Sequence, residues 1–136
     1  MKIVATNGCF DILTIAHIRL LRFCEFSGDR LIVGLNGDKS VKLLKGESRP
    51  INNQDIRKEF LLSLKCVGEV IIFDEFNCVD FLKQVKPQIY VKGGDYDLGK
   101  MNQEEYEYLK SIRAEIKFFP FIDGYSTTKM LERTKE

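Results

Sequence analysis

The chain has 136 residues, of which 44% are hydrophobic and 30% are charged, as in an ordinary globular domain. This length fits one compact domain, so we expect residues 1–136 to form a single unit. The 21 basic and 20 acidic side chains nearly cancel, which excludes a strong overall field for nucleic acid or for an anionic membrane surface. The sequence lacks an apolar stretch long enough to cross a bilayer or to act as a secretory signal, and we expect a cytoplasmic protein.

Five short apolar runs with β-branched residues predict strands, at residues 2–6, 31–35, 70–73, 89–91 and 116–119. Segments with helical spacing lie between them, at residues 15–26, 55–64, 79–85 and 103–112, and a last helix follows the hydroxyl residues near position 127. This alternation predicts an α/β fold, with a Rossmann-like parallel five-stranded sheet and helices on both faces. In such sheets ligands bind beyond the carboxyl ends of the strands, so function should be sought in the loops that follow strands.

The loop after the first strand, within TNGCFDILTIAH at residues 6–17, predicts a phosphate site. The strand stops near Gly8 and a helix begins near Thr14, which leaves backbone N–H groups and a helix N-terminus to hold an anion. Thr14 and His17 are three residues apart, so on a helix they share one face. A plain N-cap for Thr14 and a structural role for the lone His17 are the simpler alternatives.

The four cysteines are scattered and include no C-x-x-C pair, and His17 is the only histidine. This pattern predicts no zinc site or other protein-held metal.

The loop after the second strand, residues 36–53, is rich in cations. It holds Lys42, Lys45 and Arg49, and Arg57 follows on the next helix. These side chains form either a solvated charged surface or a cover that supplies positive charge to a phosphate site.

Two later loops offer glycines and hydroxyls. In VKGGDY, residues 91–96, Lys92 is followed by two glycines that permit close backbone approach to a flat ligand. In GYSTTK, residues 124–129, three hydroxyls stand at the start of a helix, where one can cap it and the others suit a phosphate.

Together these motifs resemble the nucleotidyltransferase superfamily that carries an H-x-G-H or T-x-G-H signature. Residues 8–11 and 14–17 occupy the places of its G-x-F-D and T-x-G-H segments, and GYSTTK resembles its S-T-[ST] segment. With LKGESRPIN, DIRKEFLLSLKCVGEVIIFDE and VKGGDY between them, the likeness runs from about Ile3 to Arg133. The chain is particularly similar to the adenylyltransferase domain of the bacterial bifunctional enzyme that makes ADP-heptose.

The resemblance implies a single nucleotidyltransferase domain with the strand order 3-2-1-4-5. It implies that a sugar phosphate attacks the α-phosphorus of a nucleoside triphosphate and that pyrophosphate leaves. The expected substrates are ATP and heptose 1-phosphate, with Mg²⁺ bound together with the triphosphate. The resemblance also implies a homodimer, with no nucleic acid or membrane as partner.

The same resemblance assigns roles to individual residues. The expected catalytic residues are His17, Thr14 and Lys45. The expected nucleotide-binding residues are Gly8, Cys9, Phe10, Asp11, Thr14, His17, Gly93, Gly94, Asp95, Tyr125, Ser126, Thr127 and Thr128. The expected residues for the acceptor substrate are Asp38, Lys42, Lys45, Arg49, Arg57 and Lys92.

Two alternatives stay open. One is a cytidylyltransferase that uses CTP and glycerol 3-phosphate or another alcohol phosphate; its members typically carry R-T-E-G where this chain has FIDG at residues 121–124, and they lack the lysine of KGGDY. The other is a catalytically impaired nucleotide-binding module, because Thr14 replaces a histidine found in many members and Ala16 replaces the motif glycine.

Overall fold

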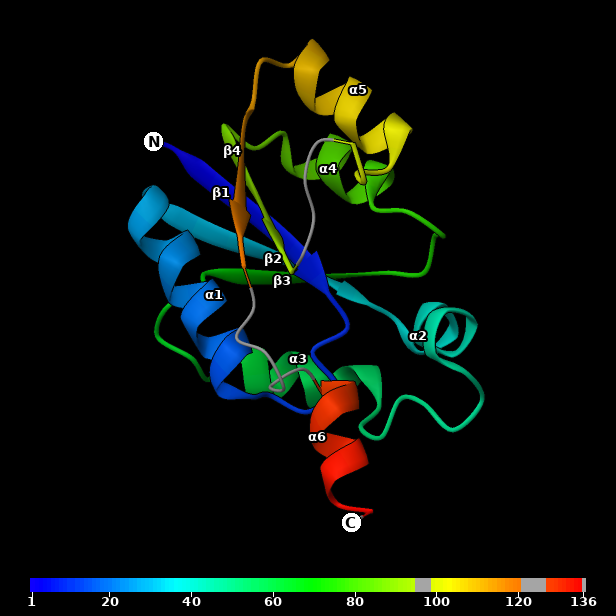
Figure 1. Cartoon of the computed structure of the whole chain (residues 1–136). Coiled ribbons are helices and arrows are strands. Elements are labelled where there is room, and N and C mark those ends of the chain that lie inside the picture. Colours follow the sequence, from blue (N-terminus) through cyan, green and yellow to red (C-terminus); the bar gives the residue numbers. More distant parts are fainter. Residues whose placement is uncertain (95–98, 121–126, 136) are drawn as a thin grey trace.

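The structure is a computed structural model that describes residues 1–94, 99–120 and 127–135 (Figure 1). Its strands are β1 (Ile3–Gly8), β2 (Arg30–Asn36), β3 (Glu69–Phe73), β4 (Ile89–Gly93) and β5 (Glu115–Phe119). Its helices are α1 (Ile15–Ser27), α2 (Asp38–Lys45), α3 (Gln54–Leu62), α4 (Val79–Val85), α5 (Gln103–Ser111) and α6 (Thr127–Arg133).

The strands form one parallel sheet in the order β3-β2-β1-β4-β5, which confirms the predicted Rossmann-like fold and strand order. β1 pairs along its whole length with β2, from Ile3 opposite Arg30 to Gly8 opposite Leu35. On its other side β1 pairs with β4, where Val4 lies opposite Ile89. The direction in which strands are added reverses between β1 and β4, so the carboxyl ends of these two strands mark the expected ligand site.

The buried side chains form a core on each face of the sheet. α1 and α3 cover one face, where Leu21 and Leu61 join Val33 in a single apolar cluster. α4 and α5 cover the other face, where Phe81 packs in a second cluster with Tyr90. Among the residues that the structure describes, no helix is long and apolar enough to span a membrane.

The main differences from the sequence prediction are one helix and the ends of β1 and β4, while other element ends shift by one or two residues. β1 continues to Gly8 and β4 to Gly93, beyond the predicted ends. The segment from Asp38 to Lys45, predicted as part of a loop, is helix α2. The helix has only eight residues, fewer than the roughly 11 or more over which helical periodicity is recognised in a sequence, and this explains why it was missed.

Candidate active site

A cavity of about 850 Å³ lies at the switch point, beyond the carboxyl ends of β1 and β4. That volume suits a ligand of the size of a nucleotide. The predicted site residues that line it are Gly8, Cys9, Phe10, Asp11, His17, Lys45, Arg49, Lys92, Gly93, Thr127 and Thr128. All four loops singled out in the sequence therefore contribute to one cavity.

Other predicted residues lie elsewhere. Those that do not line this cavity are Thr14, Asp38, Lys42, Arg57 and Gly94. Of these, Asp38 and Lys42 line a separate hollow of about 330 Å³ beside the start of α3. Asp95, Tyr125 and Ser126 fall outside the described residues.

Arg57 corrects the sequence prediction, because its guanidinium is buried in the protein and is not available to a substrate phosphate. The residue is 0% exposed. It donates hydrogen bonds to the carbonyl oxygens of Cys9 (2.8 Å), Asn36 (2.6 Å) and Asn52 (2.9 Å). It also pairs with the Asp38 carboxylate at 2.8 Å. Arg57 thus joins the loop after β1 to the end of β2 and to the segment before α3.

Asp11 is a second buried charge that the protein itself satisfies. Its carboxylate accepts hydrogen bonds from Arg49 Nε (2.8 Å) and from the backbone N–H groups of Ile51 (2.7 Å) and Asn52 (2.9 Å). Burial alone would raise the pKa of Asp11, but the hydrogen bonds from Asn52, Ile51 and Arg49 outweigh it and hold that pKa below its usual range. Asp11 therefore stays ionised and fixes the loop after β1.

We call Asp11, Arg49, Asn52 and Arg57 the β1-loop network. It extends to the C-terminal helix, because Arg49 Nη1 donates to Thr128 Oγ1 at 3.4 Å. The hydroxyl of Thr127, predicted to hold a phosphate, donates to the carbonyl oxygen of Ile12 at 2.7 Å and so docks α6 on the same loop. These contacts hold the first and last motifs of the chain together at one edge of the cavity.

The packing of Phe10 explains why a glycine stands at position 8 of the loop. Phe10 adopts a positive φ of 45°, a conformation that is uncommon for a residue with a side chain. Its buried ring lies over Gly8, where an added Cβ would come within 2.9 Å of the ring. The ring also meets His17 edge-to-face, with centroids 5.4 Å apart. Glycine at position 8 therefore makes room for the ring that supports the histidine.

His17 lies in the first turn of α1, whose N-cap residue is Thr14. The backbone N–H of Thr14 donates to His17 Nδ1 at 3.0 Å, so the proton of the neutral imidazole is on Nε2. The side chain is only 8% exposed, and burial lowers its pKa to about 4. At neutral pH His17 is therefore an uncharged N–H donor at the cavity wall, and Thr14 orients its ring. Ala16, at the position of the motif glycine, is buried and does not line the cavity.

A further wall of the cavity comes from residues that the sequence analysis missed. They include Phe76, Asn77, Cys78, Lys100, Asn102 and Glu105. The loop after β3 follows a strand, so the rule that ligands bind after strands could have found Asn77. Glu105 gave no such signal, because it lies inside a helix well beyond the nearest strand.

Comparison with known proteins assigns the chain to a protein family. A sequence model of the family described as Cytidylyltransferase-like matches residues 5–133. The chain belongs to the cytidylyltransferase-like family. The bifunctional protein HldE of Aliarcobacter butzleri is 48% identical to it over 135 residues, which are 99% of this chain and 27% of that protein. HldE of Campylobacter fetus is 46% identical over 132 residues, with 97% and 28% covered. This cytidylyltransferase-like chain thus spans about a quarter of the length of these relatives.

A solved structure agrees with the family. The crystal structure of the lipopolysaccharide core biosynthesis protein from Thermoplasma volcanium superposes with a TM-score of 0.71 at 28% identity, covering 90% of this chain and 97% of that one. The family resemblance stated from the motifs is confirmed by the family model and by these relatives.

Two cysteines, Cys9 and Cys78, line the cavity. Burial raises the pKa of Cys9, which lines the cavity, and the nearby cations Lys45, Arg57 and Arg49 only partly oppose that rise. Burial likewise raises the pKa of Cys78. Both side chains are therefore neutral thiols at neutral pH and poor nucleophiles.

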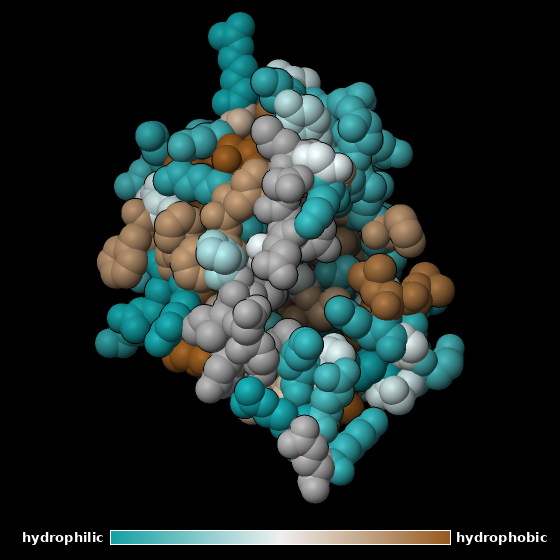
Figure 2. Space-filling view, in the orientation of Figure 1, coloured by the Kyte–Doolittle hydropathy of each residue, from teal (hydrophilic) through white to brown (hydrophobic). Residues whose placement is uncertain are grey.

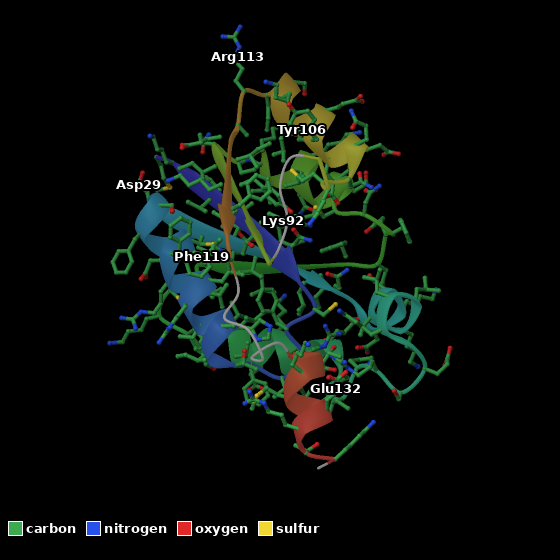
Figure 3. The ribbon with its side chains drawn as sticks, in the orientation of Figure 1. Asp29, Lys92, Tyr106, Arg113, Phe119 and Glu132 are labelled. Carbon is green, nitrogen blue, oxygen red and sulfur yellow. The ribbon has the colours of Figure 1, made fainter. Side chains whose placement is uncertain are left out.

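The cavity rim of this cytidylyltransferase-like chain combines charge with apolar surface. Lys45 and Leu44 reach the rim from α2, and Phe76 reaches it from the connection between β3 and α4. Leu44 is 48% and Phe76 78% exposed. In Figure 2 one group of brown, hydrophobic atoms lies at the right edge of the molecule, over α2 and this connection. Figure 3 labels Lys92, which lies at the carboxyl end of β4.

Proposed function

We propose that the protein is an adenylyltransferase that transfers AMP from ATP to heptose 1-phosphate and releases pyrophosphate. The observation that carries this proposal is the convergence of four loops on one cavity at the sheet's switch point. The HldE relatives support the choice of substrates, although that name belongs to proteins about four times as long.

The triphosphate would bind against the loop after β1. The backbone N–H groups of this loop and the N-terminus of α1 attract anions, and the β1-loop network fixes them in place. His17 would donate its Nε2–H to a phosphate oxygen, and Arg49 would add positive charge. These groups oppose the negative charge that builds up as the bond to the leaving pyrophosphate breaks.

The acceptor would approach from the side of Lys45 and Lys92. An oxygen of its phosphate forms a bond to the α-phosphorus, and the bond between the α-phosphorus and the bridging oxygen breaks, so that the electron pair leaves with pyrophosphate. A sugar phosphate is already ionised at neutral pH, so its oxygen needs no general base. This agrees with the low pKa of His17, which suits a hydrogen-bond donor.

The residues that the structure describes do not form a protein cage for Mg²⁺. They contain no group of three or more His, Cys, Asp or Glu residues that could hold a metal ion. The carboxylate of Asp11 in the cavity is already bound by protein donors. We therefore propose that any Mg²⁺ arrives on the triphosphate, with phosphate oxygens as its main ligands.

A test of four substrate pairs separates the hypotheses. The protein is incubated with Mg²⁺, with either ATP or CTP, and with either D-glycero-β-D-manno-heptose 1-phosphate or glycerol 3-phosphate, and pyrophosphate is measured. Release with ATP and the heptose phosphate is the expected result. Release only with CTP and glycerol 3-phosphate would favour the cytidylyltransferase alternative. Nucleotide binding without release from any pair would favour the impaired module.

A further inference from the structure

Glu105 has a structural role that uses only one of its two carboxylate oxygens. It lies in the first turn of α5, where Asn102 Oδ1 accepts a hydrogen bond from the Glu105 backbone N–H at 3.1 Å. A glutamate at this position often reaches back to the N-cap residue of its own helix. Here Oε2 instead accepts from the backbone N–H of Cys78, the N-cap residue of α4, at 2.9 Å. Glu105 therefore ties the starts of two helices together.

The other carboxylate oxygen, Oε1, takes no part in this contact between the two helix starts. Glu105 is 4% exposed, and no donor in the described part of the chain forms a hydrogen bond with Oε1. The ammonium of Lys92 lies 3.9 Å away, beyond hydrogen-bond distance. Buried carboxylate oxygens nearly always have a donor, because leaving one unsatisfied is unfavourable. The capping role does not explain why a glutamate stands at position 105.

The cavity supplies the missing explanation. Glu105 and Lys92 both line it, together with His17 and Arg49. They reach it from a different side, because Lys92 lies two residues after Tyr90 on β4 and therefore on the same face of the sheet, the face under α4 and α5, whereas His17 belongs to α1 on the opposite face. A ligand with its phosphates near His17 would turn another part towards Glu105.

We propose that Glu105 Oε1 and Lys92 Nζ bind a hydroxyl group of the acceptor sugar, so that Glu105 determines specificity for a hydroxyl-bearing acceptor; this rests on the proposed function. A hydroxyl both donates and accepts, so it can donate to Oε1 and accept from Nζ at the same time. The 3.9 Å gap leaves room for one oxygen about 2.8 Å from each atom. An ionised phosphate fits less well, because it has no proton to donate and is repelled by the carboxylate.

Substitution Glu105→Gln tests this hydroxyl site while keeping the helix cap. The glutamine oxygen can still accept from the Cys78 N–H, but its amide nitrogen then replaces Oε1 and cannot accept a hydrogen bond. The matched control is Glu104→Gln, which removes the same charge from the adjacent, exposed residue. Unchanged melting temperatures would show that both variants keep the fold.

Isothermal titration calorimetry then measures the affinity for heptose 1-phosphate and for inorganic phosphate, with the protein saturated by a non-hydrolysable ATP analogue. We expect Glu105→Gln to raise the dissociation constant for heptose 1-phosphate by about tenfold or more, since one charged hydrogen bond is lost. Glu104→Gln should bind this ligand with the affinity of the wild type. Inorganic phosphate and the ATP analogue should bind both variants as they bind the wild type.

Each other outcome has a definite meaning. Equal affinity of Glu105→Gln and wild type for heptose 1-phosphate, or no wild-type binding of this sugar, overturns the proposal. A loss of affinity for the ATP analogue alone also overturns it, because the hydroxyl would then belong to the nucleotide. Binding does not require turnover, so a protein that shows the expected difference in affinity but releases no pyrophosphate would refute the proposed reaction and leave the hydroxyl site standing.

Discussion

The β1-loop network and the part of the cavity rim that α2 forms use charged residues for different purposes. In the network, Asp11 and Arg57 are buried, and backbone groups and opposite charges of the protein satisfy them. On the rim, Lys45 is exposed to solvent. The network fixes the shape of the loop that would hold a phosphate, and the rim supplies positive charge that a ligand can meet. Charges close in sequence can thus serve either the fold or the ligand.

The first way to test this contrast is to remove Arg57. Arg57→Met keeps an unbranched side chain but leaves three carbonyl oxygens and the Asp38 carboxylate without their donor. We expect the free energy of unfolding to fall by roughly 4 kcal/mol, as for the loss of a buried, multiply bonded charge. Urea denaturation measures it. Arg19→Met, at an exposed position of α1, is the control and should change stability by less than about 0.5 kcal/mol. Equal effects of the two substitutions would refute a structural role for Arg57.

The second test asks whether His17 acts on the ligand. His17→Ala should lower kcat by roughly two orders of magnitude, which is typical for the loss of one hydrogen-bond donor to developing charge. Thr14→Ala keeps the backbone N–H that orients the ring and should lose much less activity. Steady-state pyrophosphate release measures both. A His17→Ala enzyme as fast as the wild type would make the histidine purely structural.

The third test uses pH, because burial holds the pKa of His17 at about 4, below its ordinary value of 6.5. The folded state then binds fewer protons than the unfolded state between these values, so stability is complete above pH 6.5 and is lost as the pH falls towards 4. Between pH 7 and pH 5 we expect the free energy of unfolding to fall by about 2 kcal/mol.

His17 is the only histidine of the chain, so His17→Gln should remove most of this pH dependence. Urea denaturation at pH 7, 6 and 5 compares the variant with the wild type. The same slope in both proteins would contradict a buried, neutral imidazole.

The smallest expected effect separates two lysines of α2. Lys45 lines the main cavity, whereas Lys42, one turn earlier on α2, lines the separate hollow. Lys45→Met should raise KM for one of the substrates by about tenfold, and Lys42→Met by no more than about twofold, because exposed charges act over a short range in salt. Steady-state kinetics with each substrate varied in turn provides the values. If Lys42→Met has the larger effect, the acceptor phosphate lies on the other side of α2.

The sequence predicted the fold well because the strands of a buried parallel sheet are nearly continuous apolar runs. The sequence also singled out four loops that follow strands and carry cations, hydroxyls or glycines, and the structure brings these loops to one cavity. The sequence could not show that Arg57 is a buried structural cation whereas Lys45 is an exposed one at the cavity. The partners of Arg57 are carbonyl groups from distant segments that only the tertiary structure brings together. The sequence analysis missed Glu105 for the same reason, since Cys78 and Lys92 become its neighbours only on folding.

The central claim is that this cavity transfers a nucleotidyl group, and isotope position tests it most directly. ATP labelled with ³²P at either the α or the γ phosphorus is incubated with the protein, Mg²⁺ and heptose 1-phosphate, and the products are separated. Nucleotidyl transfer predicts that the sugar product carries the α label and that the γ label leaves as pyrophosphate. Gamma label in the sugar product, or release of the γ label as inorganic phosphate alone, would contradict it.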